Sequence, residues 1–251
     1  MKKPLWVLAA ICAIGLMTFQ SPLRAQEKIK VLSDGPLRPA LVEIGEAFRR
    51  ASGHHVEFSF GTSPVVHKKV ADGEAADVLI IQPNFVEELV KAGKIVTGEH
   101  PMIGRVGFGL AMRADAPARS ITTTEELKQT LQTANSIVFN NVASGNYFAK
   151  VLERLNIADT VKAKVVRVDP PVVFERILKG TGTDIGVGTI PQIIATKGLR
   201  LVGPLPTEIQ SHIVYAAAPM SNAISPQVAQ AFIGFLASPA AKALFVANGV
   251  E

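Results

Sequence analysis

The chain has 251 residues, with 26 basic and 21 acidic side chains, one cysteine, one tryptophan and 48% hydrophobic residues. Residues 1–25 have the pattern of a cleavable secretory signal, with Lys2 and Lys3 before an apolar run and small Ala25 at the exit. Without them, 23 basic and 21 acidic residues remain, a net charge of +2, and no cysteine. The near balance argues against binding to nucleic acid, and the lack of cysteine excludes disulfides and thiolate chemistry from the mature chain.

The part of the chain after residue 25 alternates short apolar runs with amphipathic helical patterns, which predicts an α/β fold. Strands are expected at residues 29–33, 56–60, 78–81, 105–112, 136–139, 185–187 and 212–218. Helices are expected to start near residues 37, 63, 83, 123, 144, 173, 191, 225 and 238. Thr123 and Glu126 have the spacing of a capping box, in which each side chain bonds a free amide near the other residue.

Two long expected strands, 105–112 and 212–218, bracket a separate block of strands and helices. This arrangement predicts two lobes, one inserted into the other. Residues 26–107 plus 217–251 form lobe 1, and residues 108–216 form lobe 2. The chain then crosses between the lobes twice, and such a double crossing permits hinge closure around a cleft, where ligands commonly bind.

Small hydroxyl residues and glycines occupy four expected strand-to-helix turns: Ser33 with Gly35, Thr62 with Ser63, Ser144, and Thr189. Helix starts present free N–H groups and a partial positive charge, so several of them directed at one cleft bind an anion without an excess of basic residues. The alternative is that each hydroxyl caps its own helix. Four such turns, divided between two lobes, favour anion binding.

Arg38 lies in the first turn of the first expected helix, beside one of these turns. As a ligand-binding residue it would hold a carboxylate with two parallel hydrogen bonds; as a structural residue it would be a solvated surface arginine, and both interpretations stay open. No metal centre or cofactor is expected. The five histidines lack metal-site spacing, and the glycines at 180–188 are not followed by the Gly-Lys-Ser/Thr of a phosphate loop.

Several stretches of the chain resemble a known family, the periplasmic molybdate-binding type of solute-binding protein, which has a type II two-lobed fold. The stretches are VADGEAADVLI at 70–80, VASGNYFAKVLERL at 142–155, ATKGLRLVGPLP at 195–206, and Phe60–Ser63 followed by Gly73–Leu79. The resemblance covers nearly all of the mature chain. It implies a ligand held between the lobes by uncharged hydroxyls and amides at helix starts.

By position, the resemblance implies ligand contacts from Thr62, Ser63 and Ser144. The first-turn serine of the family falls on Pro36, with Ser33 and Gly35 close by. The late tyrosine falls on Thr189, and a backbone contact falls near Pro171. Because that serine and that tyrosine are absent here, molybdate or tungstate is a less suitable ligand than the family pattern suggests.

Arg38 has no place in a charge-free oxyanion site, and the chain looks more like a divergent branch of the family that includes an aconitate isomerase type of periplasmic enzyme. In such an enzyme Asp34 or Tyr147 would move the proton that the isomerisation transfers. We therefore expect a monomeric periplasmic protein that binds a small anion, an organic di- or tricarboxylate, and delivers it to an ABC transporter. The alternatives are cofactor-independent interconversion of cis- and trans-aconitate, and binding of molybdate or tungstate.

Overall fold

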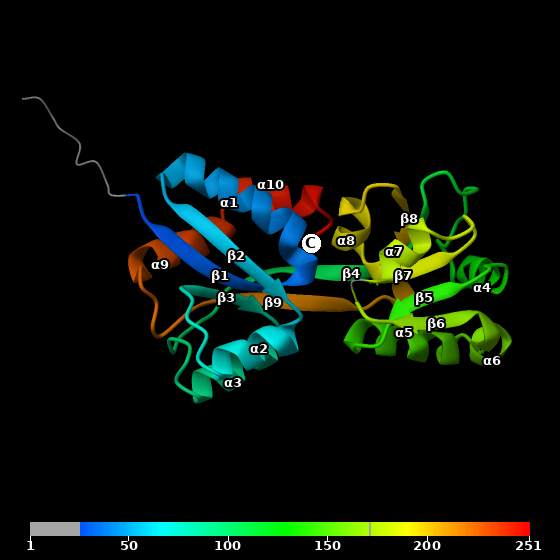
Figure 1. Ribbon diagram of the computed structural model, residues 1–251, viewed down its shortest axis with the longest axis horizontal. Coiled ribbons are helices and arrows are strands. Elements are labelled where there is room, and N and C mark those ends of the chain that lie inside the picture. Colours follow the sequence, from blue (N-terminus) through cyan, green and yellow to red (C-terminus); the bar gives the residue numbers. More distant parts are fainter. Residues whose placement is uncertain (1–25, 171) are drawn as a thin grey trace, which may run out of the picture.

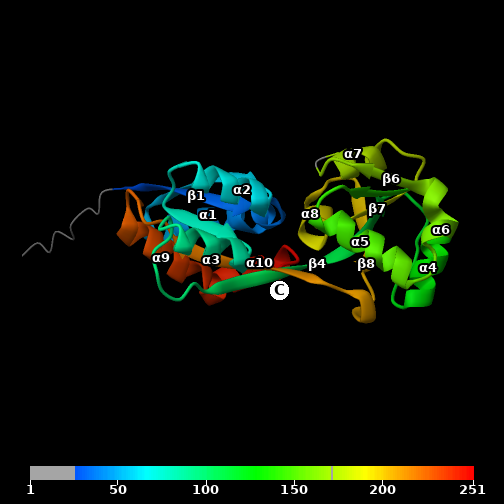
Figure 2. The same cartoon turned by 90° about the horizontal axis from the view of Figure 1, so that it is seen from below.

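The computed structural model describes residues 26–170 and 172–251. The predicted signal at 1–25 and the predicted contact at Pro171 therefore lie outside the described residues. The described chain forms two α/β lobes side by side, joined by two long strands (Figures 1 and 2). The predicted two-lobed α/β fold is confirmed.

Lobe 1 is a sheet covered by helices on both faces, and its strand order is β2-β1-β3-β9. Its parallel strands are β1 (Lys28–Asp34), β2 (His55–Gly61) and β3 (Val78–Ile81). One face packs against α1 (Arg38–Ser52), α9 (Pro226–Leu236) and α10 (Pro239–Ala247). The other face packs against α2 (Ser63–Ala71) and α3 (Pro83–Lys91). Alternate residues of β1 enter the two cores, as Val31 and Leu32 do.

Lobe 2 continues the sheet in the order β4-β7-β5-β6, and β8 pairs with β4. Its strands are β5 (Ile137–Asn140), β6 (Val165–Val168), β7 (Ile185–Thr189) and β8 (Leu199–Pro204). Its helices are α4 (Thr124–Gln132), α5 (Ala143–Arg154), α6 (Ala158–Val161), α7 (Val172–Leu178) and α8 (Ile190–Ala195). Short 3-10 helices lie at Gly35–Leu37 (η1), Lys162–Lys164 (η2) and Thr207–Ile209 (η3).

The two lobes are joined by β4 (Met102–Arg113) and β9 (His212–Pro219), which pair antiparallel with each other. The first half of β4 pairs with β9, and its second half pairs with β7 and β8 of lobe 2. Glu251 lies against this junction, where its carboxylate contacts Arg105 Nη2 at 2.8 Å and His212 Nε2 at 3.6 Å. The same two strands therefore form the connection between the lobes.

The predicted strands and helices are present. Two further strands, β6 and β8, were not predicted from the sequence. The apolar run of β6 is only four residues long and contains Arg167, and that of β8 contains Arg200 and Gly203. The capping box is confirmed, since Thr123 Oγ1 accepts from Glu126 N and Glu126 accepts from the Thr123 amide. Among residues 26–170 and 172–251, no single helix is long and apolar enough to cross a membrane. Within these residues, only α9 and α10 taken together, a pair with a sharp bend between them, reach the required length and hydropathy. Both helices pack on the lobe 1 core.

Candidate functional site

The helix starts named from the sequence lie at the facing edges of the two lobes. The carboxyl ends of β1 and β2 and the starts of α1 and α2 point toward lobe 2, while the β5–α5 turn and α8 lie at the edge of lobe 2 nearest lobe 1 (Figure 1). In open α/β sheets, ligands bind at such carboxyl ends. This arrangement makes the facing edges the candidate site.

Asp34 ends β1 and is the best-connected polar side chain on the lobe 1 edge. Its Oδ1 accepts a hydrogen bond from Gly35 N at 2.8 Å, and its Oδ2 accepts from Ser63 Oγ at 2.5 Å and Ser63 N at 3.2 Å. Asp34 is 5% exposed and Ser63 is fully buried. Burial raises the pKa of Asp34, although the hydrogen bonds from Ser63 and Gly35 partly oppose this shift.

Tyr215 on β9 lies close to Asp34 and was missed from the sequence. Its hydroxyl is buried and has no hydrogen-bond partner among the described residues other than the nearby Asp34. Burial, together with the nearby charge of Asp34, raises the pKa of Tyr215 well above its usual value. Within the sequence Tyr215 is one residue of an apolar strand, and no local pattern shows that β9 brings it to the end of β1.

Arg38 is the first residue of α1, and its guanidinium carbon lies 4.2 Å from the centroid of the Phe60 ring at the end of β2. The side chain is exposed and makes no hydrogen bond or ion pair with any residue in 26–170 or 172–251. A guanidinium stacked on an aromatic ring keeps its edge N–H groups free for a carboxylate. The structure thus places Arg38 on the candidate edge with its donors available.

Thr62 and Ser33 flank Asp34 and differ in how their hydroxyls are used. Thr62 stands at the N-cap position of α2 without a side-chain capping bond, so its half-buried hydroxyl is not committed to the helix. Ser33 is fully buried, and its hydroxyl lies 3.4 Å from the Asp34 carbonyl oxygen. Of the hydroxyls predicted on lobe 1, that of Thr62 is the one directly accessible to a ligand.

The β5–α5 turn of lobe 2 is organised by Asn140 and contains the predicted Ser144. Asn140 Oδ1 accepts from Gly145 N at 2.9 Å, Ser144 Oγ at 3.1 Å and Val142 N at 3.2 Å. Gly145 is needed here, because a Cβ at this position would lie 1.7 Å from the Asn140 carbonyl oxygen. The amides and the hydroxyl of this turn therefore all donate to one neutral side chain, that of Asn140. Ser144 is half-buried beside it.

Thr189 brings lobe 2 into contact with lobe 1 through Gln192 of α8. The buried Thr189 hydroxyl donates to Gln192 Oε1 at 2.8 Å, and a Cβ at Gly35 would lie 3.9 Å from Gln192 Nε2. The side-chain amide of Gln192 therefore reaches the turn that follows β1. Gln192 was not named from the sequence, where it is an ordinary residue of a short helix.

Tyr147, the second acid/base predicted for an isomerase, is already committed within lobe 2. Its hydroxyl donates to the Ile209 carbonyl at 2.6 Å, and its ring stacks on Phe108 with centroids 5.5 Å apart. Asp34 and Tyr147 thus belong to separate hydrogen-bond groups. The structure gathers Ser33, Asp34, Gly35, Thr62 and Ser63 at one edge, with Arg38 beside them and Thr189 reaching them through Gln192.

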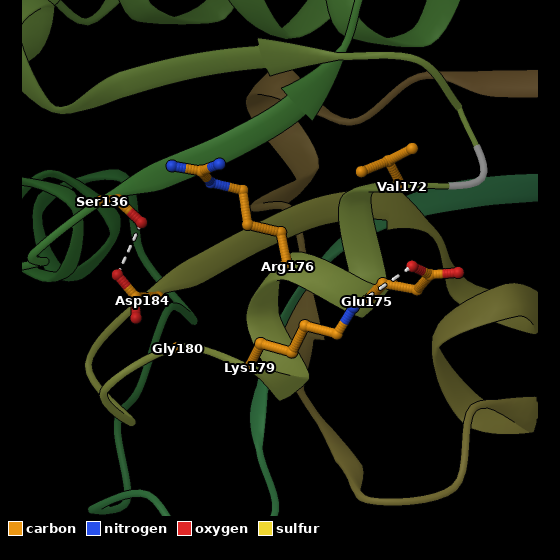
Figure 3. Close-up of a pocket in the computed structure, with 7 residues that line it drawn as sticks. All are labelled: Ser136, Val172, Glu175, Arg176, Lys179, Gly180 and Asp184. Carbon is orange, nitrogen blue, oxygen red and sulfur yellow. Dashed lines mark hydrogen bonds and ion pairs between the residues drawn. The ribbon is translucent and has the colours of Figure 1, made fainter.

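The pocket drawn in Figure 3 lies elsewhere on lobe 2. It has a volume of about 490 Å³ and is lined by Ser136, Val172, Glu175, Arg176, Lys179, Gly180 and Asp184. Ser136 donates to Asp184 at 2.6 Å, and Lys179 pairs with Glu175 at 3.8 Å (Figure 3). Because these charges largely offset one another, this pocket offers an anion less than the facing helix starts do.

Comparisons with known proteins find similarity over nearly all of the described chain. The profile of a family described as bacterial extracellular solute-binding protein matches residues 29–251. An aconitate isomerase from a Pseudomonas species is 27% identical over 239 residues, covering 91% of each chain. The molybdate-binding protein ModA of Escherichia coli (strain K12) is 21% identical over 247 residues, covering 96% of each. The periplasmic molybdate-binding protein of Azotobacter vinelandii has the same fold, with a TM-score of 0.72, 20% identity, and coverage of 89% of this chain and 98% of that one.

Proposed function

Because the chain belongs to the family of bacterial extracellular solute-binding proteins, we propose that it binds a small organic di- or tricarboxylate between its two lobes. In this proposal residues 1–25 direct export and are removed. The mature protein works in the periplasm and delivers its ligand to the membrane component of an ABC transporter.

The observation that carries the proposal is the state of Arg38. Its guanidinium rests on Phe60 at 4.2 Å and has no anionic partner among the described residues. The bidentate geometry of arginine matches a planar carboxylate, and stacking on the ring reduces the side-chain entropy that binding would otherwise cost.

The rest of the candidate site supplies neutral donors for a second carboxylate. Thr62 on lobe 1 has an uncommitted hydroxyl, and Ser144 on lobe 2 lies half-buried in the β5–α5 turn, beside the neutral side chain of Asn140. With a net charge of only +2 after residue 25, attraction by bulk charge is weak. Recognition then depends on these local groups.

A ligand screen by thermal melting tests the proposal, because a ligand that binds only the folded state raises the melting temperature. Mature protein is heated with citrate, cis- and trans-aconitate, malate and succinate, and with molybdate, tungstate and sulfate as competing candidates. A rise with at least one polycarboxylate and none with the inorganic anions supports the proposal. No rise with any organic acid rejects it, and a rise with molybdate or tungstate alone selects the oxyanion alternative.

A second candidate function is cofactor-independent aconitate isomerisation, favoured by the 27% identical aconitate isomerase and by the raised pKa of buried Asp34. A raised pKa makes a carboxylate a stronger base, which favours removing and returning a proton. Incubation with cis-aconitate in heavy water provides the test. Formation of trans-aconitate containing deuterium, lost in Asp34→Asn, supports this activity; no conversion at high protein concentration rejects it for this substrate.

A further inference from the structure

The Asp34 carboxylate occupies the donors that would otherwise serve an anion on lobe 1. The amides of Gly35 and Ser63 stand at the starts of η1 and α2, and both donate to Asp34, as does the Ser63 hydroxyl. Such convergent amides at a helix start are a general anion-binding arrangement. Here the anion is a side chain of the protein itself.

The donors around Asp34 are occupied by a buried carboxylate of the protein itself. Asp34 is 5% exposed, and no lysine, arginine or histidine among the described residues pairs with it. A buried carboxylate without a counter-ion depends entirely on its hydrogen bonds. Its three donors are therefore fully engaged and not free for a second anion.

Tyr215 provides an independent sign that this place is built to hold an anion. Its hydroxyl is fully buried beside the Asp34 carboxylate, and no other described residue bonds to it. Buried hydroxyls are normally hydrogen-bonded, so a buried donor whose only described polar neighbour is the Asp34 carboxylate marks a place that is built to hold an anion.

We infer that Asp34 is a specificity-determining residue, whose carboxylate occupies the amide and hydroxyl donors at the end of β1 and thereby excludes compact dianions such as sulfate and molybdate. A dianion at the amides of Gly35 and Ser63 would displace the carboxylate or lie against its charge. A longer organic acid avoids this conflict, since Arg38 and Thr62 offer donors that Asp34 does not occupy. This inference rests on the proposed function, because it assumes that anions enter between the lobes.

The test compares anion affinities of the wild-type protein with those of Asp34→Asn and Asp34→Ser. Asp72→Asn is the matched control, because it makes the same change in net charge at the exposed far end of α2. Calorimetric titration at neutral pH is carried out with sulfate, molybdate and citrate. We expect the wild type and Asp72→Asn to bind neither inorganic anion, and the folded Asp34 variants to gain sulfate or molybdate affinity by at least about tenfold.

Two results overturn the inference: tight binding of sulfate or molybdate by the wild type, or a folded Asp34→Ser protein with unchanged affinity for both. The outcome is separable from that of the proposed function. If no organic acid binds any variant but Asp34→Ser gains oxyanion binding, the proposed ligand class fails and the role of Asp34 stands. If citrate binds the wild type and Asp34→Ser gains nothing, only the role of Asp34 fails.

A measurement on the wild type covers the case in which neither Asp34 variant folds. Sulfate stays doubly charged from about pH 7.5 to about pH 4, whereas Asp34 takes up a proton as the pH falls. Tyr215 is the titratable group that contacts Asp34. Histidines also titrate in this range, but those with described partners contact other groups. These pairs are His54 with Glu27 N, His67 with Glu88, His100 with Val96 O, and His212 with Glu251. We expect sulfate affinity to rise toward pH 4 as Asp34 is neutralised; an affinity that does not rise overturns the inference.

Discussion

The two lobes finish corresponding strands with side chains of the same shape and different charge. Asp34 ends β1 and accepts from the turn and helix start that surround it, Gly35 N and Ser63 N. Asn140 ends β5 and accepts in the same way from Gly145 N and Val142 N. On opposite edges of the candidate site, a carboxylate oxygen and an amide oxygen therefore accept hydrogen bonds from equivalent backbone amides.

The difference between the two edges is one negative charge and its burial. On lobe 1 the charge is enclosed, and burial raises the pKa of Asp34. On lobe 2 the acceptor is neutral, and Ser144 beside it is half-buried. One turn geometry therefore encloses a charged carboxylate on lobe 1 and a neutral amide on lobe 2, and only the lobe 2 turn carries no negative charge that would repel an anion.

Each lobe also stacks one arginine on a phenylalanine, again with different consequences. Arg38 lies 4.2 Å from the Phe60 centroid and has no described hydrogen-bond partner. Arg167 lies 5.1 Å from the Phe139 centroid, and its guanidinium donates to Asn146 Oδ1 at 2.5 Å and to the Asn140 carbonyl at 3.3 Å. Arg167 thus uses its N–H donors within its own lobe, whereas those of Arg38 are free.

The largest effect, a loss of stability, is expected from Gly145→Ala, which disrupts the β5–α5 turn of lobe 2. Its Cβ would lie 1.7 Å from the Asn140 carbonyl oxygen, so the start of α5 must move away from β5. We expect the free energy of unfolding in urea to fall by about 3 kcal/mol or more. Gly234→Ala in α9 is the control, since its Cβ meets nothing within 4 Å, and it should be neutral or stabilising. Equal stability of the two variants would contradict the described turn.

Arg38→Ala and Arg167→Ala separate the two stacked arginines. Loss of a charge-assisted pair costs about 1.5–3 kcal/mol, so Arg38→Ala should weaken binding of the organic acid about 10- to 150-fold by calorimetry, with an unchanged unfolding midpoint. Arg167→Ala should leave affinity within about threefold and slightly lower stability. If Arg167→Ala weakened binding and Arg38→Ala left affinity unchanged, Arg38 would be an ordinary surface arginine.

Asn140→Asp makes lobe 2 resemble lobe 1: it keeps the Oδ1 acceptor and replaces the Nδ2 group, which donates to Ser144 Oγ at 2.7 Å, with a second carboxylate oxygen. The new charge lies beside Ser144 and should repel the incoming anion, weakening its affinity about tenfold at low salt and less at high salt. Titrations at two ionic strengths measure both effects. Unchanged affinity would place the ligand away from the β5–α5 turn.

The smallest effect is a pH dependence of stability that has opposite signs in the two lobes. The pKa of Asp34 is raised on folding, so its stabilising contribution is complete below 3.8 and is lost as the pH rises through the raised value. Hydrogen bonds from Thr122 and Ser120 lower the pKa of Glu126 to about 2, so its contribution is present above 4.5 and is lost as the pH falls toward 2. Urea unfolding across this range should show Asp34→Asn without the first dependence and Glu126→Gln without the second. A dependence that survives both substitutions has another origin.

The sequence predicted more of the fold than of the site. Apolar periodicity located most strands and helices, and the long strands indicated the two lobes, because these signals lie within single elements. The capping box at Thr123 and Glu126 is of the same local kind and is confirmed. The strands β6 and β8 were missed because charged or glycine residues interrupt their short apolar runs.

The sequence by itself determined that this is a two-lobed α/β chain with hydroxyls and glycines at its helix starts and an arginine, Arg38, on the first turn of α1. Only the tertiary structure decided how these groups are used. It buried Ser63 against Asp34, brought Tyr215 of β9 to the end of β1, and placed Gln192 of α8 beside Gly35. The physical reason is that burial and hydrogen-bond partners depend on strand order and lobe packing, which join residues far apart in the chain.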